Sequence, residues 1–384
     1  MEVKQVYDIM NSVTKATLGE EEVVAEDLKN IVDIGDKIVN VAGVENYVRS
    51  LTDHIGKTIF VNRAYSGSVP SVLMDGWEFG SILEKVSYDE LPEATENESW
   101  QLEDGKSYDV NVFTQPKASA KFFNKRVTFE VPMSFAERQV KSAFDNASQL
   151  NAFFSMIYNA IDKSMTVKVD GLVSRTINNM IGETFVDAQT NTDSIKAVNL
   201  LKMYNNRFGT SLKASNCLLE PEFIRFASLH INLYSERMTK LSKLFNVGGK
   251  DRFTSKSLQH LVLLSEFKEY AETYLYSDTF HEEYTNLPKC ETVPYWQGSG
   301  TGYDFASTSK IHVKTASGNE IEQAGILGII FDRDSLGVSN LDRRVTSNYN
   351  AKGEFFNNWY KFDAGYFNDL NENFVVFYVG DDAA

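Results

Sequence analysis

Five histidines are the side chains of this 384-residue chain that could most readily bind a metal ion or transfer a proton near neutral pH. They stand at His54, His230, His260, His281 and His312. No pair of them has the spacing of a zinc site or of a metalloprotease helix. His281 is the strongest candidate because Glu282 and Glu283 follow it, but a surface or packing role is the better interpretation for all five histidines.

Two glycine-containing stretches resemble parts of anion-binding loops, and each lacks an essential feature. Gly56, Lys57 and Thr58 end like a phosphate-binding loop, but Leu51 stands where that loop needs a glycine. The stretch 298–302 could present backbone N–H groups to an anion, but no helix clearly follows it to add its dipole. Neither stretch therefore predicts a phosphate site.

Acidic side chains give two further candidates for a metal site. Asp332 and Asp334 begin like a calcium loop, but Arg343 occupies the twelfth position, where the loop needs a glutamate. Seven acidic residues and no basic residue fall between positions 89 and 104, and we interpret this run as a solvated loop. No G-x-S-x-G nucleophile motif occurs. The sequence predicts no catalytic residue, no metal site and no cofactor, and so it gives no positive evidence for an enzyme.

Composition narrows the function classes further. A net charge of −15 argues against free-standing nucleic-acid binding, which depends on Lys and Arg at phosphates, but an acidic surface could still enclose DNA without adhering to it. Two distant cysteines, Cys217 and Cys290, predict free thiols in a reducing cytoplasm. The chain shows neither a signal-peptide h-region nor an apolar run of membrane-spanning length, so we expect no membrane partner.

The longest element that the sequence predicts is a helix over residues 134–182, where apolar residues recur every three or four positions. Ser134 and Glu137 could form its capping box, and Gly182 could end it. At about 1.5 Å per residue it would measure roughly 70 Å, whereas a globule of this chain length is only about 55 Å across. The helix is therefore broken, at 146–149 or at Gly171, or the protein is elongated around it. Aromatic residues and alanines on its seam favour a strut within one chain over a coiled coil.

A long β-hairpin is predicted just before this helix. Apolar and polar residues alternate over 108–112 and again over 127–131, with a small-residue tip at 115–121. A two-stranded hairpin is marginally stable alone, so we expect it to lie on another surface. The residues expected to contact another subunit are Pro116, Lys117, Lys121, Phe122 and Phe123.

The rest of the chain reads as an α+β protein. Residues 2–55 form helical segments of an arm. The predicted later helices are 194–207, 221–245 and 266–276. The predicted strands are 58–61, 72–74, 81–86, 216–219, 258–264, 310–315, 326–331, 343–347, 355–362 and 374–379.

Several stretches of the second half resemble the major capsid proteins of tailed bacteriophages with the HK97 fold. The stretches are 325–338, 346–350 and 365–379, together with 263–267 and 294–298. The similarity of element order covers nearly the whole chain. The resemblance implies an HK97-like capsid fold with an N-terminal arm (1–60), an extended loop with a β-hairpin (61–132), a peripheral domain with a long spine helix (133–189 and 341–370) and an axial α/β domain (190–340 and 371–384).

The same resemblance implies a structural role and no enzyme activity. It predicts a major capsid protein that self-assembles into hexamers and pentamers of an icosahedral shell around double-stranded phage DNA, without sequence-specific DNA binding. Scaffold and portal proteins are the other expected partners, and because residues 1–55 leave little room for a scaffolding region, we expect a separate scaffold. Assembly is expected in the host bacterial cytoplasm and the mature location in the virion capsid. Certain family members crosslink a hairpin lysine to an asparagine, and Lys117 and Lys121 lie near the predicted tip, with no partner indicated.

Two alternatives stay open from the sequence. One is a nanocompartment shell of the same fold that packages an enzyme. The other is a soluble α+β enzyme.

Overall fold

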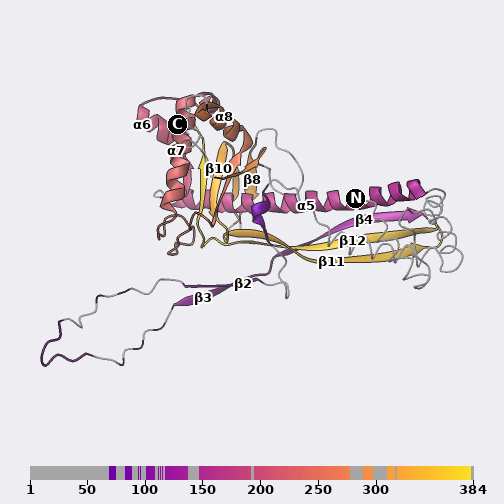
Figure 1. The fold of residues 1–384 in the computed structure, drawn as a ribbon, viewed down its shortest axis with the longest axis horizontal. Coiled ribbons are helices and arrows are strands. Elements are labelled where there is room, and N and C mark those ends of the chain that lie inside the picture. Colours follow the sequence, from indigo (N-terminus) through magenta and orange to yellow (C-terminus); the bar gives the residue numbers. More distant parts are fainter. Residues whose placement is uncertain are drawn as a thin grey trace. The chain divides into compact units, whose positions relative to one another are not determined.

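The structure is a computed structural model, and it divides the chain into two compact units (Figure 1). Unit 1 comprises Met1–Ser81, Arg126–Val173 and Val338–Gly365, and unit 2 comprises Ile82–Lys125, Ser174–Gly337 and Tyr366–Ala384. The structure describes residues 69–74, 83–88, 94, 96, 101–108, 111, 113, 115, 117–136, 147–191, 194–276, 289–296, 309–315 and 318–381. Outside the described residues lie the predicted arm (1–60), His54, the 56–58 pattern, Pro116, His281 and the 298–302 stretch.

The long helix is present, with different ends from those predicted. Helix α5 (Ala147–Thr190) has 44 residues, so it is about 66 Å long. It is unbroken at Gly171, which excludes the alternative of a break there, and it continues past Gly182, so the predicted end was wrong. The predicted capping box was also wrong, because Ser134 lies in strand β4 (Arg126–Ala136). Side chains of β4 alternate between half-buried and exposed, which is the period of two that a strand imposes.

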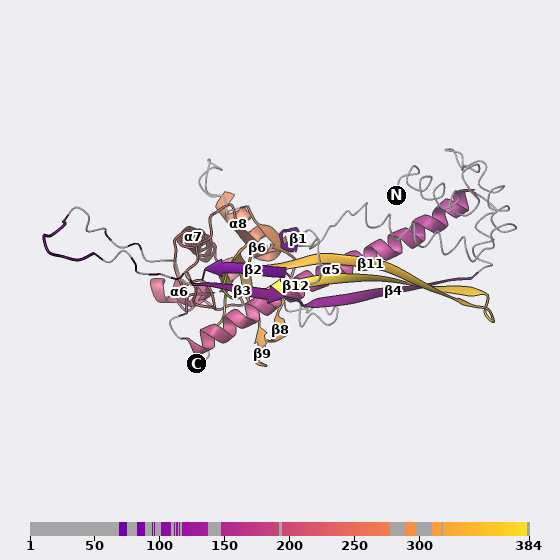
Figure 2. The same cartoon turned by 90° about the horizontal axis from the view of Figure 1, so that it is seen from below.

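Unit 1 contains a four-stranded sheet in the order β1-β11-β12-β4. Its other strands are β1 (Leu73–Met74), β11 (Leu336–Asn350) and β12 (Phe355–Asn368), and the short 3-10 helix η2 (Pro70–Val72) precedes β1. Strand β4 pairs antiparallel with β12 over its whole length, and Figure 2 shows these two strands beside β11. The predicted pairing of 127–131 with 108–112 is not found: 127–131 pair with β12, and the described residues of 108–112, Tyr108 and Asn111, lie in no strand.

Aromatic packing and a hydrogen bond to a buried carboxylate hold β4 to β12, and Arg344 of β11 pairs with the same carboxylate. The ring of Phe129 packs on that of Phe362, with centroids 5.2 Å apart. Asp363 is buried, and its carboxylate accepts hydrogen bonds from Thr128 Oγ1 at 2.6 Å and from Arg344 Nη1 at 2.8 Å.

Unit 2 is built on a five-stranded sheet in the order β5-β13-β10-β6-β7. The strands are β5 (Ala197–Asn199), β13 (Phe374–Tyr378), β10 (Ile326–Asp332), β6 (Gln259–Leu264) and β7 (Glu291–Val293). The central strand β10 is buried along its whole length and pairs antiparallel with both neighbours. Helices α6 (Leu200–Phe208), α7 (Pro221–Arg237) and α8 (Ser265–Tyr276) lie beside this sheet, and β8 (Ile311–Lys314) pairs with β9 (Glu320–Gln323) in a separate ribbon.

Three predicted elements of unit 2 differ from the structure. The helix predicted over 194–207 begins only at Leu200, and Ala197–Asn199 form strand β5. The stretch 216–219, predicted as a strand, contains the short 3-10 helix η4 (Cys217–Leu219). Helix α7 ends at Arg237 rather than near Phe245, because the chain then turns back on itself and Ser242 pairs with Arg252. Within the described part of the chain, no helix combines the length and the apolar character that crossing a bilayer requires.

Candidate functional site: the anchored ribbon of β2 and β3

Strands β2 (Leu83–Tyr88) and β3 (Ala118–Phe123) form a two-stranded antiparallel ribbon in unit 2. The register pairs Leu83 with Phe123 and Lys85 with Lys121. Every described residue between positions 94 and 117, which connect the two strands, is exposed, and Lys117 is one of them. The predicted tip of the hairpin, 115–121, was therefore wrong, because residues 118–121 belong to strand β3 and the connection precedes them.

The two faces of the ribbon differ in burial. Leu83, Lys85, Lys121 and Phe123 share one face, and each is half-buried. Phe123 packs on Phe367 with ring centroids 5.1 Å apart. The opposite face carries Val86 and Phe122, which are 67% and 63% exposed. One face is thus attached to unit 2, and the other presents apolar side chains to the surroundings.

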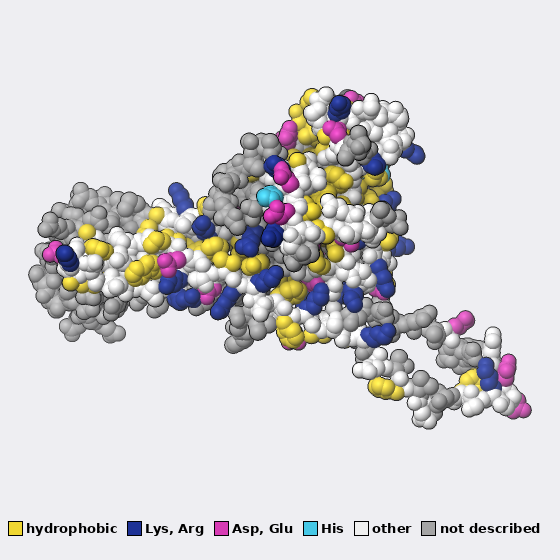
Figure 3. All heavy atoms as spheres, turned by 180° about the vertical axis from the view of Figure 1, so that it is seen from behind, with side chains coloured by type: hydrophobic (Ala, Val, Ile, Leu, Met, Phe, Trp, Pro, Cys, Tyr) yellow, Lys and Arg dark blue, Asp and Glu magenta, His cyan; other side chains and the backbone are white. Residues whose placement is uncertain are grey.

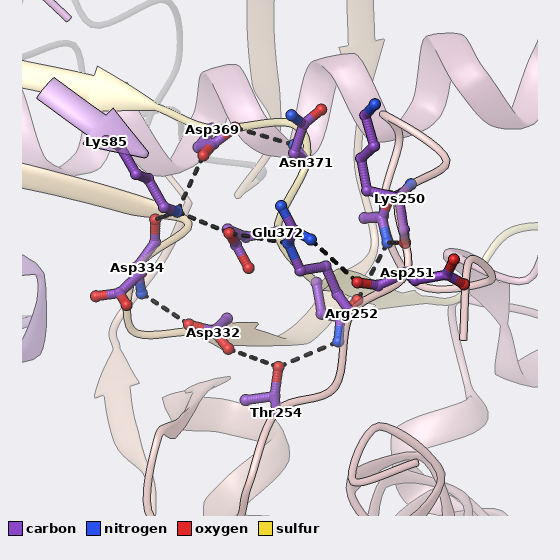
Figure 4. Close-up of polar contacts among 12 residues, drawn as sticks. Lys85, Lys250, Asp251, Arg252, Thr254, Asp332, Asp334, Asp369, Asn371 and Glu372 are labelled. Atoms are coloured by element: carbon purple, nitrogen blue, oxygen red, sulfur yellow. Dashed lines mark hydrogen bonds and ion pairs between the residues drawn. The ribbon is translucent and has the colours of Figure 1, made fainter. Parts of the chain in front are cut away.

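A buried carboxylate, that of Asp369, joins the two lysines of the attached face, and Figure 4 shows its contact with Lys85. Lys85 Nζ lies 3.0 Å from Asp369 Oδ2, and Lys121 Nζ lies 3.0 Å from Asp369 Oδ1. Directly opposed like charges on neighbouring strands repel, so Asp369 removes a repulsion that the register would otherwise create. Lys85 Nζ also donates to Glu372 Oε1 at 2.8 Å and to the carbonyl oxygen of Asp334 at 3.1 Å.

The turn between β12 and β13 fixes the two acidic side chains. The backbone N–H of Asp369 donates to Ser335 O at 2.7 Å, and Asp369 Oδ1 accepts from Asn371 N at 3.1 Å. Arg252 Nε lies 3.3 Å from Glu372 Oε1. These backbone and ionic contacts hold the carboxylates in place while the side chains of Asp369 and Glu372 are only 2% and 10% exposed.

The charges of this cluster change the pKa values of its members. Burial alone would raise the pKa of Asp369, but the positive charge of Lys85 and the hydrogen bonds from Lys121 and Lys85 outweigh it, so this pKa is lowered. Burial alone would lower the pKa of Lys85, but its hydrogen bond to Glu372 and the charges of Glu372 and Asp369 raise it. Both residues are therefore ionised at neutral pH.

Asp332 and Asp334, which resemble the start of a calcium loop, have a structural role next to this cluster. Asp332 Oδ2 accepts from Thr254 Oγ1 at 2.6 Å, and Asp332 Oδ1 accepts from the backbone N–H of Asp334 at 2.9 Å. Asn373 Nδ2 donates to Thr254 Oγ1 at 3.1 Å. The Asp332 carboxylate thus closes the turn after β10 and holds it to the segment that contains Thr254.

The other candidate residues for chemistry lie in separate elements. His230 in α7 packs on Phe226, and His260 in β6 packs on Phe331; burial lowers the pKa of both histidines. His312 is exposed in β8. The thiols of Cys217 and Cys290 are free, and burial raises the pKa of Cys217 to about 11. Among the residues that the structure describes, no group of three or more His, Cys, Asp or Glu side chains could hold a metal ion.

Sequence reasoning did not identify Lys85, Asp369 or Glu372 as a site. Lys85 lay in a predicted strand, and Asp369 lay in the 365–379 stretch that carried the resemblance. Of the residues expected to contact another subunit, Lys121 and Phe123 contact their own chain, Phe122 is exposed, and Lys117 lies in the connection.

Comparisons with known proteins agree on one class. Residues 10–378 match the family model of the Phi29-like phage major capsid protein. A search of curated proteins finds no match. A chain in the structure of the head fiber and inner core protein gp22 of native bacteriophage P68 is 9% identical with a TM-score of 0.52, over 83% of this chain and 86% of that chain.

Two further solved structures are similar at lower scores. The capsid structure of Staphylococcus phage Andhra gives 11% identity and a TM-score of 0.48, over 83% of this chain and 86% of that chain. The capsid structure of the cyanophage P-SCSP1u gives 9% identity and a TM-score of 0.46, over 84% of this chain and 90% of that chain. At 9% identity the likeness to the P68 chain bears on the fold alone, and together with the helices and strands described above it confirms the expectation of a mixed fold.

Proposed function

The chain belongs to the Phi29-like phage major capsid protein family, and from this premise we propose that it self-assembles into hexamers and pentamers of an icosahedral shell that encloses double-stranded phage DNA. Membership makes the chain a structural protein of a bacteriophage capsid and places it in the virion. The match over residues 10–378 is the observation that carries the proposal.

We assign the chain to the HK97 type of capsid fold. The order of its elements supports this assignment: a ribbon with a long connection, then the 44-residue helix α5, then the helices and the five-stranded sheet that follow α5 in the chain. In this assignment the arm is 1–60, the extended loop is 61–132, the peripheral domain is 133–189 with 341–370, and the axial domain is 190–340 with 371–384. The ribbon then belongs to the extended loop, and α5 is the spine helix.

We propose that the exposed face of the ribbon packs on a neighbouring subunit. Val86 and Phe122 are large, apolar and more than half exposed, and burying such side chains contributes about 25 cal/mol per Å². Asp369 and Glu372 hold the opposite face, so the ribbon reaches a neighbour in a defined direction. The contact residues proposed are Pro116, Lys117, Lys121, Phe122 and Phe123, with Phe122 the foremost because Lys121 and Phe123 already contact their own chain.

The remaining parts of the proposal concern partners and location. The net charge of −15 suits a protein that encloses DNA without sequence-specific binding. A scaffold protein and a portal protein are the other proposed partners, and assembly takes place in the host bacterial cytoplasm. The protein needs no membrane, cofactor or enzyme activity for this role.

Electron microscopy of the purified full chain tests the proposal. Wild-type protein should form uniform closed shells. Phe122→Ser should remain a folded subunit that forms few or no shells, whereas the conservative variant Phe122→Leu should assemble normally. A wild-type chain that stays monomeric at every concentration and salt would contradict self-assembly, and normal shells from Phe122→Ser would exclude the ribbon contact alone.

A further inference from the structure

Residues 237–256, which we call the basic loop, comprise the last residue of α7 and most of the segment that leads from α7 to β6. We propose that the basic loop is a docking surface for the acidic connection between β2 and β3 of a second copy of this chain. This inference rests on the proposed shell assembly and names one of its contacts.

The basic loop has a charge opposite to that of the chain as a whole. It contains six basic residues and one acidic residue, in a chain of net charge −15. On the face drawn in Figure 3, Lys and Arg side chains are scattered among hydrophobic and acidic ones, so the excess of basic residues in the basic loop is a feature of its sequence. Lys240 is exposed and has no ion pair among the described residues, and Lys243 is 53% exposed beside Asp251 at 3.5 Å. These lysines are available to a partner of opposite charge.

Apolar side chains stand among these lysines. Leu241, Leu244 and Phe253 are 48%, 56% and 60% exposed. The pairing of Ser242 with Arg252 is antiparallel, so Leu241 stands opposite Phe253 and Lys243 opposite Asp251, all on one face. This face therefore presents exposed hydrophobic surface beside the Lys243–Asp251 ion pair, within a segment that is basic as a whole, and exposed apolar surface of this kind is typical of a protein-binding surface.

The backbone of the basic loop is fixed in advance of any contact. Thr254 N donates to Met238 O, and Phe374 N donates to Phe245 O, each at 2.8 Å. Asn246 closes the segment through two hydrogen bonds with the backbone of Lys250, both 2.8 Å long. A surface that is already ordered loses little conformational entropy on binding.

The connection between β2 and β3 has the complementary chemistry. Seven of its residues from 89 to 104 are acidic and none is basic. Glu103 and Asp104 are exposed and have no ion pair with any described residue, and Leu102 beside them is 69% exposed. Gly105, at φ +82°, and the hydrogen bond from Lys106 N to Glu103 O shape the turn that presents them.

A second copy is the source that fits these observations. The described residues of this connection are exposed in their own chain, so they do not occupy its basic loop. Double-stranded DNA is a poorer occupant, because phosphate contacts need cations and leave Leu241, Leu244 and Phe253 uncovered. An acidic segment that also carries leucine satisfies both parts of the surface, and complementary charges speed association and select the partner.

Reversing the charges of the basic loop and of the acidic connection, first separately and then together, tests the inference in the full chain. Lys240→Glu with Lys243→Glu should lower the yield of shells by about tenfold or more, and Glu103→Lys with Asp104→Lys should do the same. Combining all four substitutions restores opposite charges and should restore most of the yield. Lys213→Glu with Lys314→Glu makes the same change of net charge at exposed positions elsewhere in unit 2 and should assemble normally.

Sedimentation velocity and electron microscopy give the yields, and circular dichroism confirms that each variant is folded. Full assembly of the Lys240/Lys243 variant would overturn the inference while leaving the proposed function intact. So would a loss that the four-fold variant does not recover, or normal shells that fail only to retain DNA. Wild-type protein that forms no shells would overturn the proposed function together with this inference.

Discussion

Replacing Asp369 by Asn should release the ribbon from the rest of unit 2 without unfolding that unit. Asparagine keeps the shape of the side chain and can still accept the hydrogen bond from Asn371 N, but it loses the ion pairs to Lys85 and Lys121, each 3.0 Å long. Lys85 and Lys121 then face each other across the ribbon with no shared carboxylate between them. The repulsion and the lost ion pairs both favour the undocked ribbon.

The free-energy cost of Asp369→Asn follows from the exposure of the side chains of Asp369, Lys85 and Lys121. Breaking a buried ion pair by removing one partner costs about 3–5 kcal/mol. Lys85 retains Glu372, and Lys121 is 39% exposed, so water and the remaining carboxylate compensate in part. We therefore expect about 3 kcal/mol, the lower end of that range, which raises the equilibrium constant for ribbon opening roughly 100-fold.

Hydrogen exchange measured by mass spectrometry on the unassembled subunit reports this opening. Amides of β2 and β3 should exchange much faster in Asp369→Asn, while those of the fully buried strand β10 should not change. Glu320→Gln removes one negative charge from an exposed position of β9 and is the matched control. Adding Lys121→Met to Asp369→Asn should recover part of the protection. Equal ribbon exchange in Asp369→Asn and wild type would refute the role given to Asp369.

Three further results are expected. The pKa of Asp369 is lowered in the folded protein, so its carboxylate contributes to the free energy of unfolding above its unfolded pKa of about 3.9. This contribution is lost as the pH falls through the folded pKa. The difference in urea stability between wild type and Asp369→Asn should therefore be constant from about pH 7 to 5 and shrink below about pH 4. Gly182→Ala should raise the free energy of unfolding by about 0.5–1 kcal/mol, because glycine destabilises a helix interior relative to alanine and the new Cβ meets Val313 Cγ1 at an ordinary 3.4 Å. Gly248→Ala should lower the free energy of unfolding by about 2 kcal/mol, because its Cβ would lie 2.0 Å from Asn371 Oδ1. Thermal unfolding of the two variants checks both signs. Cys217, whose pKa burial raises to about 11, should react with iodoacetamide at pH 8 only after unfolding, so rapid native labelling would contradict its burial.

Local sequence patterns predicted most helices and strands, but they gave the wrong boundaries where two patterns overlap. Ser134 has Glu137 three residues later, which is a valid capping signal, yet Ser134 lies in β4 because the alternation that begins at Val127 continues through it. Gly182 was a reasonable helix end by residue type. It lies inside α5, where an added Cβ would meet Val313 Cγ1 at 3.4 Å, an ordinary van der Waals contact. A glycine can stand at a helix end or in a helix interior, so its residue type alone does not decide between the two.

Strand pairing was the part of the fold that the sequence could not supply. A nearest-neighbour hairpin was predicted for 108–131, but β4 pairs with β12, whose residues lie more than 200 positions later. Alternation identifies a strand and says nothing of its partner. The site fails to appear in the sequence for the same reason: Lys85, Asp369 and Glu372 come together only after the ribbon and the β12–β13 turn are placed.

The ion pairs on the attached face of the ribbon follow from how little apolar surface a two-stranded ribbon can bury. One of its faces must stay free for a neighbour in the proposed shell, so only one face is available to hold it to its own subunit, and Phe123 is the aromatic contact there. Ion pairs with buried carboxylates add little net stability over a well-packed apolar contact, but they require particular distances and directions. We infer that Asp369 and Glu372 serve mainly to direct the ribbon. An apolar side chain in place of Lys85 could hold the ribbon to its subunit and still allow the ribbon to shift along that surface. Lys85 contacts two fixed carboxylates, those of Asp369 and Glu372, and both contacts are made in only one position of the ribbon.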